Sequence, residues 1–172
     1  MAGEIRLLAP GTVVVWGATG RTAPTPNELL TITSLAIDGT RIGAQRDFGV
    51  LTAGRAFRFR YFLEFKPGAT VDTDETYELL GACGDTELNT RMEGDVGVAD
   101  AALTDGAPQA QNCTPIHTIS GRGNASKLVV SGELLITTRY WSPVFIGGAS
   151  ALSATDNDHL LTLTLLEIVN IQ

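Results

Sequence analysis

The residues best suited to chemistry lie near the C-terminal end of the sequence. Asp156 and Asp158 precede His159 directly in the chain, and carboxylates next to an imidazole can hold a metal ion that activates water. A metal-assisted hydrolase using these three residues is therefore one hypothesis. The same residue types are common in turns between strands, and a turn in which His159 bonds to a neighbour is the interpretation that we favour.

Other catalytic patterns are weaker. The only other histidine is His117, and the segment Gly148–Leu152 lacks the second glycine of a nucleophile elbow. The cluster Asp72–Glu75 has oxygen ligands suited to calcium, but it lacks the central glycine and distal glutamate of a calcium loop. We therefore predict no enzyme, with no catalytic residues, no cofactor and no metal.

Two adjacent aromatic residues, Tyr140 and Trp141, stand next to Arg139 and before Pro143. Exposed aromatic rings of this kind could form a platform on which a sugar stacks. The alternative, which we favour, is that both rings close one end of a hydrophobic core.

Strand patterns run through the whole chain. In Phe57–Phe65 every second residue is aromatic or leucine while Arg58, Arg60 and Glu64 alternate with them, which predicts a half-buried strand. Helix signals are nearly absent. Further segments rich in Val, Ile, Thr or aromatic residues predict strands at Gly11–Trp16, Leu29–Ile37, Thr76–Ala82, Ile116–Ser120, Leu128–Tyr140, Val144–Ile146 and His159–Val169.

These strands predict an all-β fold, an antiparallel two-sheet sandwich that is jelly-roll-like, in one domain over residues 1–172. A closed barrel is the alternative. Asp38-Gly39 predicts a two-residue hairpin between Leu35–Ile37 and Thr40–Ile42. The alternation in the last strand breaks at Leu166, which indicates a bulge or a second buried face.

The overall charge and the cysteines limit the partners and the compartment. A formal net charge of −7 argues against nucleic acid as a partner, since phosphate binding needs a basic surface. No apolar run approaches the length of a membrane span, and no secretory signal precedes the first strand. Cys83 and Cys113 fit neither a disulfide framework nor a zinc site. We therefore expect a protein made in a cytoplasm, with no membrane partner.

Charge is unevenly distributed along the chain, and residues from about 84 to 115 read as a long acidic excursion. Opposite charges in different parts of the surface suit contact between copies or docking on a charged partner, although each stretch could equally be a solvated face. Between residues 72 and 105 the single basic residue is Arg91, and the acidic residues are Asp72, Asp74, Glu75, Glu78, Asp85, Glu87, Glu93, Asp95, Asp100 and Asp105. Between residues 41 and 66 the basic residues are Arg41, Arg46, Arg55, Arg58, Arg60 and Lys66.

The first residues of the chain are apolar enough to bind a partner. Residues 1–16 could form an arm that adds a strand to the sheet of a neighbouring copy. The alternative, which we favour slightly, is an ordinary first strand of the same sandwich. The candidate partner-binding residues are Ile5, Leu7, Leu8, Val13, Val14, Val15 and Trp16.

An order of features from Arg55 to Glu167 resembles virion structural proteins of tailed bacteriophages. The features are an aromatic strand ending in Phe65-Lys66-Pro67-Gly68, then Thr76-Tyr77-Glu78-Leu79, then a stretch rich in Gly and Asp that reaches Asp100-Ala101-Ala102, then Arg139–Ile146, then Ser153–His159, and finally Leu160–Thr164.

This resemblance implies a small β-sandwich on the outer surface of the phage particle and no catalytic residues. We expect a capsid decoration or cement protein that binds the major capsid protein lattice and copies of itself, as a homo-oligomer such as a trimer. The alternative function is a tail or host-recognition domain that binds cell-surface carbohydrate through Tyr140 and Trp141.

Overall fold

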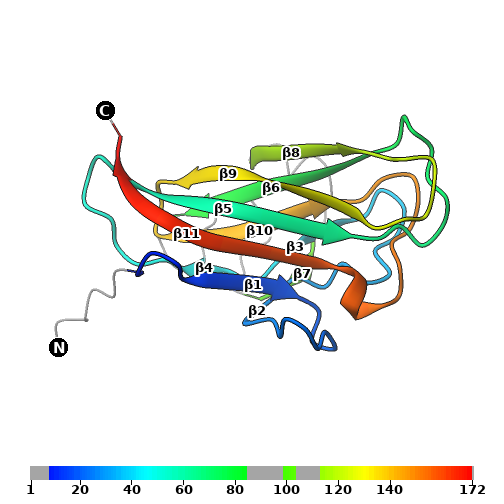
Figure 1. Ribbon diagram of the computed structural model, residues 1–172, viewed down its shortest axis with the longest axis horizontal. Helices are drawn as coiled ribbons and strands as arrows, with labels where there is room; N and C mark the ends of the chain where they lie inside the picture. Colours follow the sequence, from blue (N-terminus) through cyan, green and yellow to red (C-terminus); the bar gives the residue numbers. More distant parts are fainter. Residues whose placement is uncertain (1–7, 85–98, 104–112, 172) are drawn as a thin grey trace.

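The computed structural model describes residues 8–84, 99–103 and 113–171, which form two β-sheets packed face to face (Figure 1). Sheet A contains, in spatial order, β2 (Glu28–Leu29), β1 (Val13–Gly17), β11 (Leu160–Asn170), β5 (Arg55–Phe65) and β9 (Leu128–Ile136). Sheet B contains β7 (Ala101–Ala102), β3 (Thr40–Ile42), β10 (Tyr140–Ile146), β6 (Thr76–Gly84) and β8 (Thr114–Ser120), while β4 (Arg46–Asp47) also pairs with β10.

The strand order is that of an eight-stranded jelly roll. Along the chain, β1 lies in sheet A, β3 in sheet B, β5 in sheet A, β6 and β8 in sheet B, β9 in sheet A, β10 in sheet B and β11 in sheet A. All these strands pair antiparallel, and only the short β2 runs parallel to β1. The predicted antiparallel jelly-roll sandwich is confirmed, and the closed barrel is wrong.

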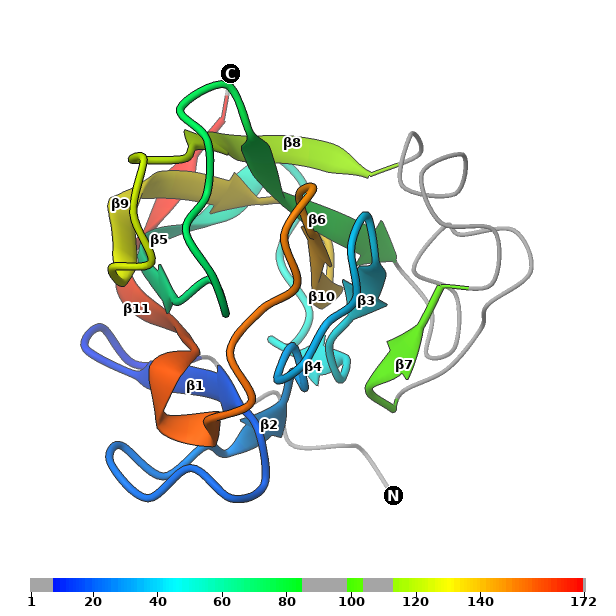
Figure 2. The same cartoon turned by 90° about the vertical axis from the view of Figure 1, so that its right-hand side faces the viewer.

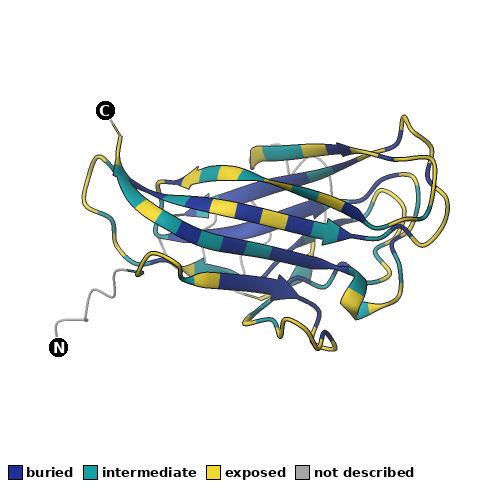
Figure 3. Ribbon diagram, viewed as in Figure 1, coloured by how far each residue is buried: buried dark blue, intermediate teal, exposed yellow. Residues whose placement is uncertain are grey.

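The core lies between the two sheets, and the inward face of β5 supplies its centre. Phe57, Phe59, Tyr61, Leu63 and Phe65 are all buried, whereas the residues between them are half-buried or exposed, apart from the buried Ala56 that precedes Phe57 (Figure 3). The strand predicted from this alternation is therefore confirmed.

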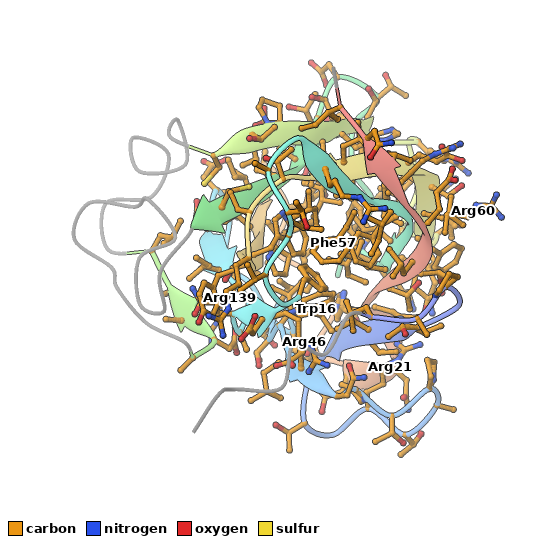
Figure 4. The ribbon with its side chains drawn as sticks, turned by 90° about the vertical axis from the view of Figure 1, so that its left-hand side faces the viewer. Trp16, Arg21, Arg46, Phe57, Arg60 and Arg139 are labelled. Atoms are coloured by element: carbon orange, nitrogen blue, oxygen red, sulfur yellow. The ribbon has the colours of Figure 1, made fainter. Side chains whose placement is uncertain are left out.

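Aromatic rings join the sheets across this core. The ring of Phe65 lies 4.8 Å from that of Tyr77 on β6 and 5.0 Å from that of Phe145 on β10. The rings of Trp16 on β1 and Trp141 on β10 meet edge to face, with centroids 5.4 Å apart. Figure 4 shows Trp16 and Phe57 inside the sandwich and Arg60 pointing away from it.

The strand predicted at Leu29–Ile37 is wrong beyond Leu29. The chain turns at Ser34, whose φ is 56°, and leaves the sheet. Leu30 and Ile32 are nevertheless buried in the core. Irregular chain that covers the end of a sandwich buries apolar side chains as a strand does, and the sequence pattern therefore resembles a strand.

The predicted hairpin at Asp38-Gly39 is also wrong, although a turn is present. The Gly39 amide donates a hydrogen bond to the Ala36 carbonyl at 2.9 Å, and Asp38 itself takes the positive φ of 53°. Only one side of the turn continues as a strand, which is β3.

The prediction for Leu128–Tyr140 joined two strands into one. β9 ends at Ile136, and the chain crosses to sheet B, where β10 begins at Tyr140. The predicted irregularity near Leu166 is confirmed, because the pairing of β11 with β5 shifts register between Leu165 and Glu167.

Part of the predicted acidic excursion packs onto the outer face of sheet B. β7 pairs with β3, and Leu103 is buried in a second, smaller apolar cluster with Ile42, Leu80 and Val144. The Asp100 carboxylate accepts two hydrogen bonds of 2.8 Å from the Arg41 guanidinium. Residues 85–98 and 104–112 of this stretch lie outside the described residues.

A tyrosine links the sheets at the side where β8 and β9 lie next to each other (Figure 2). The Tyr61 hydroxyl on β5 is 2.6 Å from Nδ1 of His117 on β8. Its ring crosses over Gly132, the residue paired with it on β9, and a Cβ atom at position 132 would lie 2.6 Å from the hydroxyl oxygen. Only glycine at position 132 leaves room for this link.

We expect Gly132→Ala to destabilise the fold by about 1–3 kcal/mol, because the new methyl group overpacks a buried ring. The cost should disappear in a Tyr61→Leu background, where the ring is absent. Urea unfolding of the four variants in this double-mutant cycle measures the coupling. An equal cost in both backgrounds would contradict the steric explanation.

Candidate interaction surface

The Asp156–Asp158 segment forms a one-turn 3-10 helix, η1, within a charged cluster at one end of the sandwich. Arg21 lies at the centre of this cluster and is almost fully buried. Its guanidinium donates to Glu64 at 2.9 Å and to the backbone carbonyls of Asn157 and His159 at 2.9 and 2.8 Å. Arg21 thereby fastens the loop after β1 to both β5 and the start of β11.

Asp158 and His159 serve the same structural role. The Asp158 carboxylate accepts a hydrogen bond from the Ser153 hydroxyl at 2.8 Å and lies 3.7 and 3.8 Å from the amines of Lys66 and Lys127. His159 is 1% exposed, and its Nε2 is 2.9 Å from the Ser153 carbonyl oxygen. His159 is therefore held inside the loop and not at the surface.

The buried environment moves the titration of both groups. Burial lowers the pKa of His159, and this effect exceeds the opposite effect of its contact with Ser153. For Asp158, burial raises the pKa, but the Ser153 hydroxyl and the two lysines lower it overall. His159 is therefore neutral and Asp158 charged at neutral pH, as an internal ionic network requires.

The second acidic cluster, Asp72–Glu75, also has a structural role. The Glu75 carboxylate is buried and accepts hydrogen bonds from the Tyr77 hydroxyl at 2.6 Å and the Ser150 amide at 2.7 Å. It joins the loop before β6 to the loop after β10. In the described ranges, no group of three His, Cys, Asp or Glu side chains is arranged to hold a metal ion.

Tyr140 and Trp141 do not present a sugar platform. Both are buried, at 6% and 1% exposure, and the Arg139 guanidinium lies 4.8 Å from the centre of the Tyr140 ring. The two rings close one end of the core, so neither presents an exposed face on which a sugar could stack.

The N-terminal candidates divide into two groups. Val13 to Trp16 belong to β1 inside sheet A, and Val14, Val15 and Trp16 are buried, so these three cannot bind a partner in an arm. The Trp16 indole donates to the Ala44 carbonyl at 2.9 Å. Leu8 is half-buried against the core, while Ile5 and Leu7 lie outside the described residues.

The basic stretch from Arg41 to Lys66 is mostly neutralised by neighbours. Arg41 pairs with Asp100, Arg46 with Glu28, and Arg58 with both Glu133 and Glu167. The expected positive surface is therefore much weaker than the sequence indicates.

The surface best suited to a partner is the outer face of sheet A. Val13, Phe62, Val129 and Leu135 are all exposed on this face, although they come from three different strands. Short polar side chains lie between them, since Thr162 and Ser131 flank Phe62 in the strand register. The ion pair of Arg58 and Glu133 lies on the same face. A sheet face that mixes apolar, small polar and charged residues has the composition of a protein contact surface.

This face ends at the edge strand β9, next to a gap between the two sheets. A cavity of about 240 Å³ opens there between β9 and β8, with Trp141, Leu134 and Ile116 among its walls. Within the described part of the chain, β9 pairs only with β5. The sequence did not indicate this site, because the site depends on which strands lie at the edges of the sheets, and the strand order is set by the tertiary structure.

The fold defines a jelly-roll β-sandwich domain, and the outer face of sheet A is its candidate interaction surface. No protein-family model matches the chain, and no curated protein matches it. One solved structure that it resembles is the Eiger TNF from S. frugiperda, with 9% sequence identity, a TM-score of 0.37, and coverage of 90% of this chain and 85% of that chain. In the residues that the structure describes, no helix is long and apolar enough to cross a membrane.

We expect stability to fall as the pH drops below about 6.5, because His159 is buried neutral and the unfolded chain then binds a proton that the folded chain does not. The pKa values of Asp158 and Asp47 are lowered in the folded chain. The stability that these two carboxylates contribute is therefore lost only at more acidic pH. Urea unfolding at several pH values should show a flatter profile for His159→Gln, with His117→Gln as the control. An unchanged slope in His159→Gln would contradict this assignment.

Proposed function

We propose that this chain is a non-enzymatic structural protein of a tailed-phage particle, a decoration protein that binds the major capsid protein lattice on the outer surface of the head. The observation that carries a binding role is the outer face of sheet A, on which four apolar side chains are exposed. The phage assignment rests on the resemblance of residues Arg55 to Glu167, which span β5 to most of β11.

The distribution of polar groups supports a structural role over a catalytic one. The candidate acids and bases, Asp158, His159 and Glu75, bond to loops of the sandwich itself. Arg21 and the buried ion pairs hold the ends of the β-sandwich rigid. A rigid body with a broad contact face suits a protein that stabilises an assembly through many weak contacts.

The same observations weaken the sugar-binding alternative. The aromatic residues on which it depended, Tyr140 and Trp141, are part of the core.

Cosedimentation of the purified protein with capsid shells that lack it tests this proposal. We expect saturable binding at a copy number that matches the capsid symmetry, and a higher melting temperature of the decorated shells, because a protein that binds only the assembled state stabilises it. Shells that bind no protein at low and at high salt would overturn the proposal.

A matched pair of variants locates the contact. Phe62→Asp places a charge in the centre of the sheet A face, and we expect it to weaken shell binding about tenfold or more, as loss of a central anchor does. Ile37→Asp is the control, since Ile37 is exposed at 59% on a loop outside this face. Equal effects of the two substitutions would exclude the sheet A face as the contact.

A further inference from the structure

The indole N–H of Trp141 is a hydrogen-bond donor buried inside the sandwich. Trp141 is 1% exposed, and among the described residues no acceptor bonds to its Nε1 atom. Trp16, the other tryptophan, donates its indole N–H to the Ala44 carbonyl at 2.9 Å. Buried polar groups in folded proteins nearly always have a partner. We therefore expect an acceptor from outside the chain at Trp141.

Gly81 on β6 brings this donor to the cavity between β9 and β8. Trp141 and Gly81 both line this cavity, which has a volume of about 240 Å³. The indole lies against Gly81, because a Cβ atom at position 81 would collide with Nε1 of Trp141 and lie 3.1 Å from its Cε2. The edge of the indole that carries the N–H therefore forms part of the cavity wall.

The cavity is large enough for a small ring compound. Cys83, Pro115, Ile116 and Leu134 supply apolar walls. A cavity of about 150 Å³ with apolar walls admits benzene, so a volume of about 240 Å³ leaves room for a ring with a small substituent. The apolar walls favour a mainly apolar molecule, and the indole N–H favours a carbonyl oxygen or a ring nitrogen on that molecule.

The polar links next to the cavity leave its space open. The Glu133 carboxylate, on the adjoining part of β9, pairs with Arg58 at 2.8 Å on the outer face of sheet A. The Tyr61–His117 link passes over Gly132, and these three residues do not line the cavity. The cavity opens between β8 and β9, which are edge strands in the described part of the chain (Figure 2). A ligand therefore has an entry route that leaves the strand pairing intact.

We propose that this cavity binds a small, mainly apolar ring compound whose carbonyl oxygen or ring nitrogen accepts a hydrogen bond from the Trp141 indole N–H. This inference goes beyond the proposed function and does not depend on it, because the cavity lies between the two sheets and the proposed capsid contact lies on the outer face of sheet A. The ligand and the capsid are consequently tested by separate binding measurements.

Titration of the ¹⁵N-labelled full-length protein with acetophenone, followed by NMR, tests the proposal. We expect a saturable downfield shift of the Trp141 indole N–H resonance, because this proton then bonds to the carbonyl oxygen. The Trp16 indole, which is already bonded to Ala44, is the internal control and should move much less. No saturable shift up to the solubility limit of acetophenone would overturn the proposal, as expected if a water molecule alone satisfies the donor.

Isopropylbenzene is the matched probe, since it has nearly the same shape as acetophenone and no acceptor. We expect it to shift the methyl resonances of Ile116 and Leu134, which line the cavity, without the downfield shift of the Trp141 indole N–H. Equal downfield shifts of this N–H with the two probes would contradict the hydrogen bond on which the ligand class depends.

A pair of substitutions on β9 locates the ligand. Leu134→Trp fills the cavity from its wall, and we expect it to abolish saturable binding of acetophenone. Val129→Trp is the control, because Val129 is exposed on the outer face of the same strand, and this variant should bind as the wild type does. Circular dichroism checks that both variants fold, and the wild-type titration decides the proposal if Leu134→Trp does not. Equal binding by the two folded variants would place the ligand elsewhere and overturn the proposal.

Discussion

The contact between the inward face of β5 and the inner face of sheet B holds the rest of the structure in place. Phe57, Phe59, Tyr61, Leu63 and Phe65 are buried on a single strand that also pairs with both β11 and β9. Burying such side chains removes a large apolar area from water, which is the main favourable term in folding. Both sheets are therefore assembled around one strand.

Polar contacts help the apolar ones to close the ends of the sandwich. Arg21 joins Glu64 to the chain beside η1, and Glu75 joins the loop before β6 to the loop after β10. A buried charge is costly unless it is paired and hydrogen-bonded. These networks consequently fix the loop positions.

On the described part of the surface, exposed apolar side chains gather on the outer face of sheet A. Phe62, Val129 and Leu135 lie on the outer face of sheet A, and the free edge of β9 borders it. This arrangement supports the proposed binding role, since a sandwich presents such a face without rearrangement. The capsid is the proposed partner for this face.

The sequence by itself determined the fold class and the main strand, because alternation in Phe57–Phe65 is a local property of the chain. It did not separate strands from irregular core segments at Leu30 to Ile37, where burial produces the same pattern. Only the tertiary structure decided that Trp141 and His159 are buried and that β9 is an edge. These properties depend on which distant segments meet, and spacing along one chain does not contain that information.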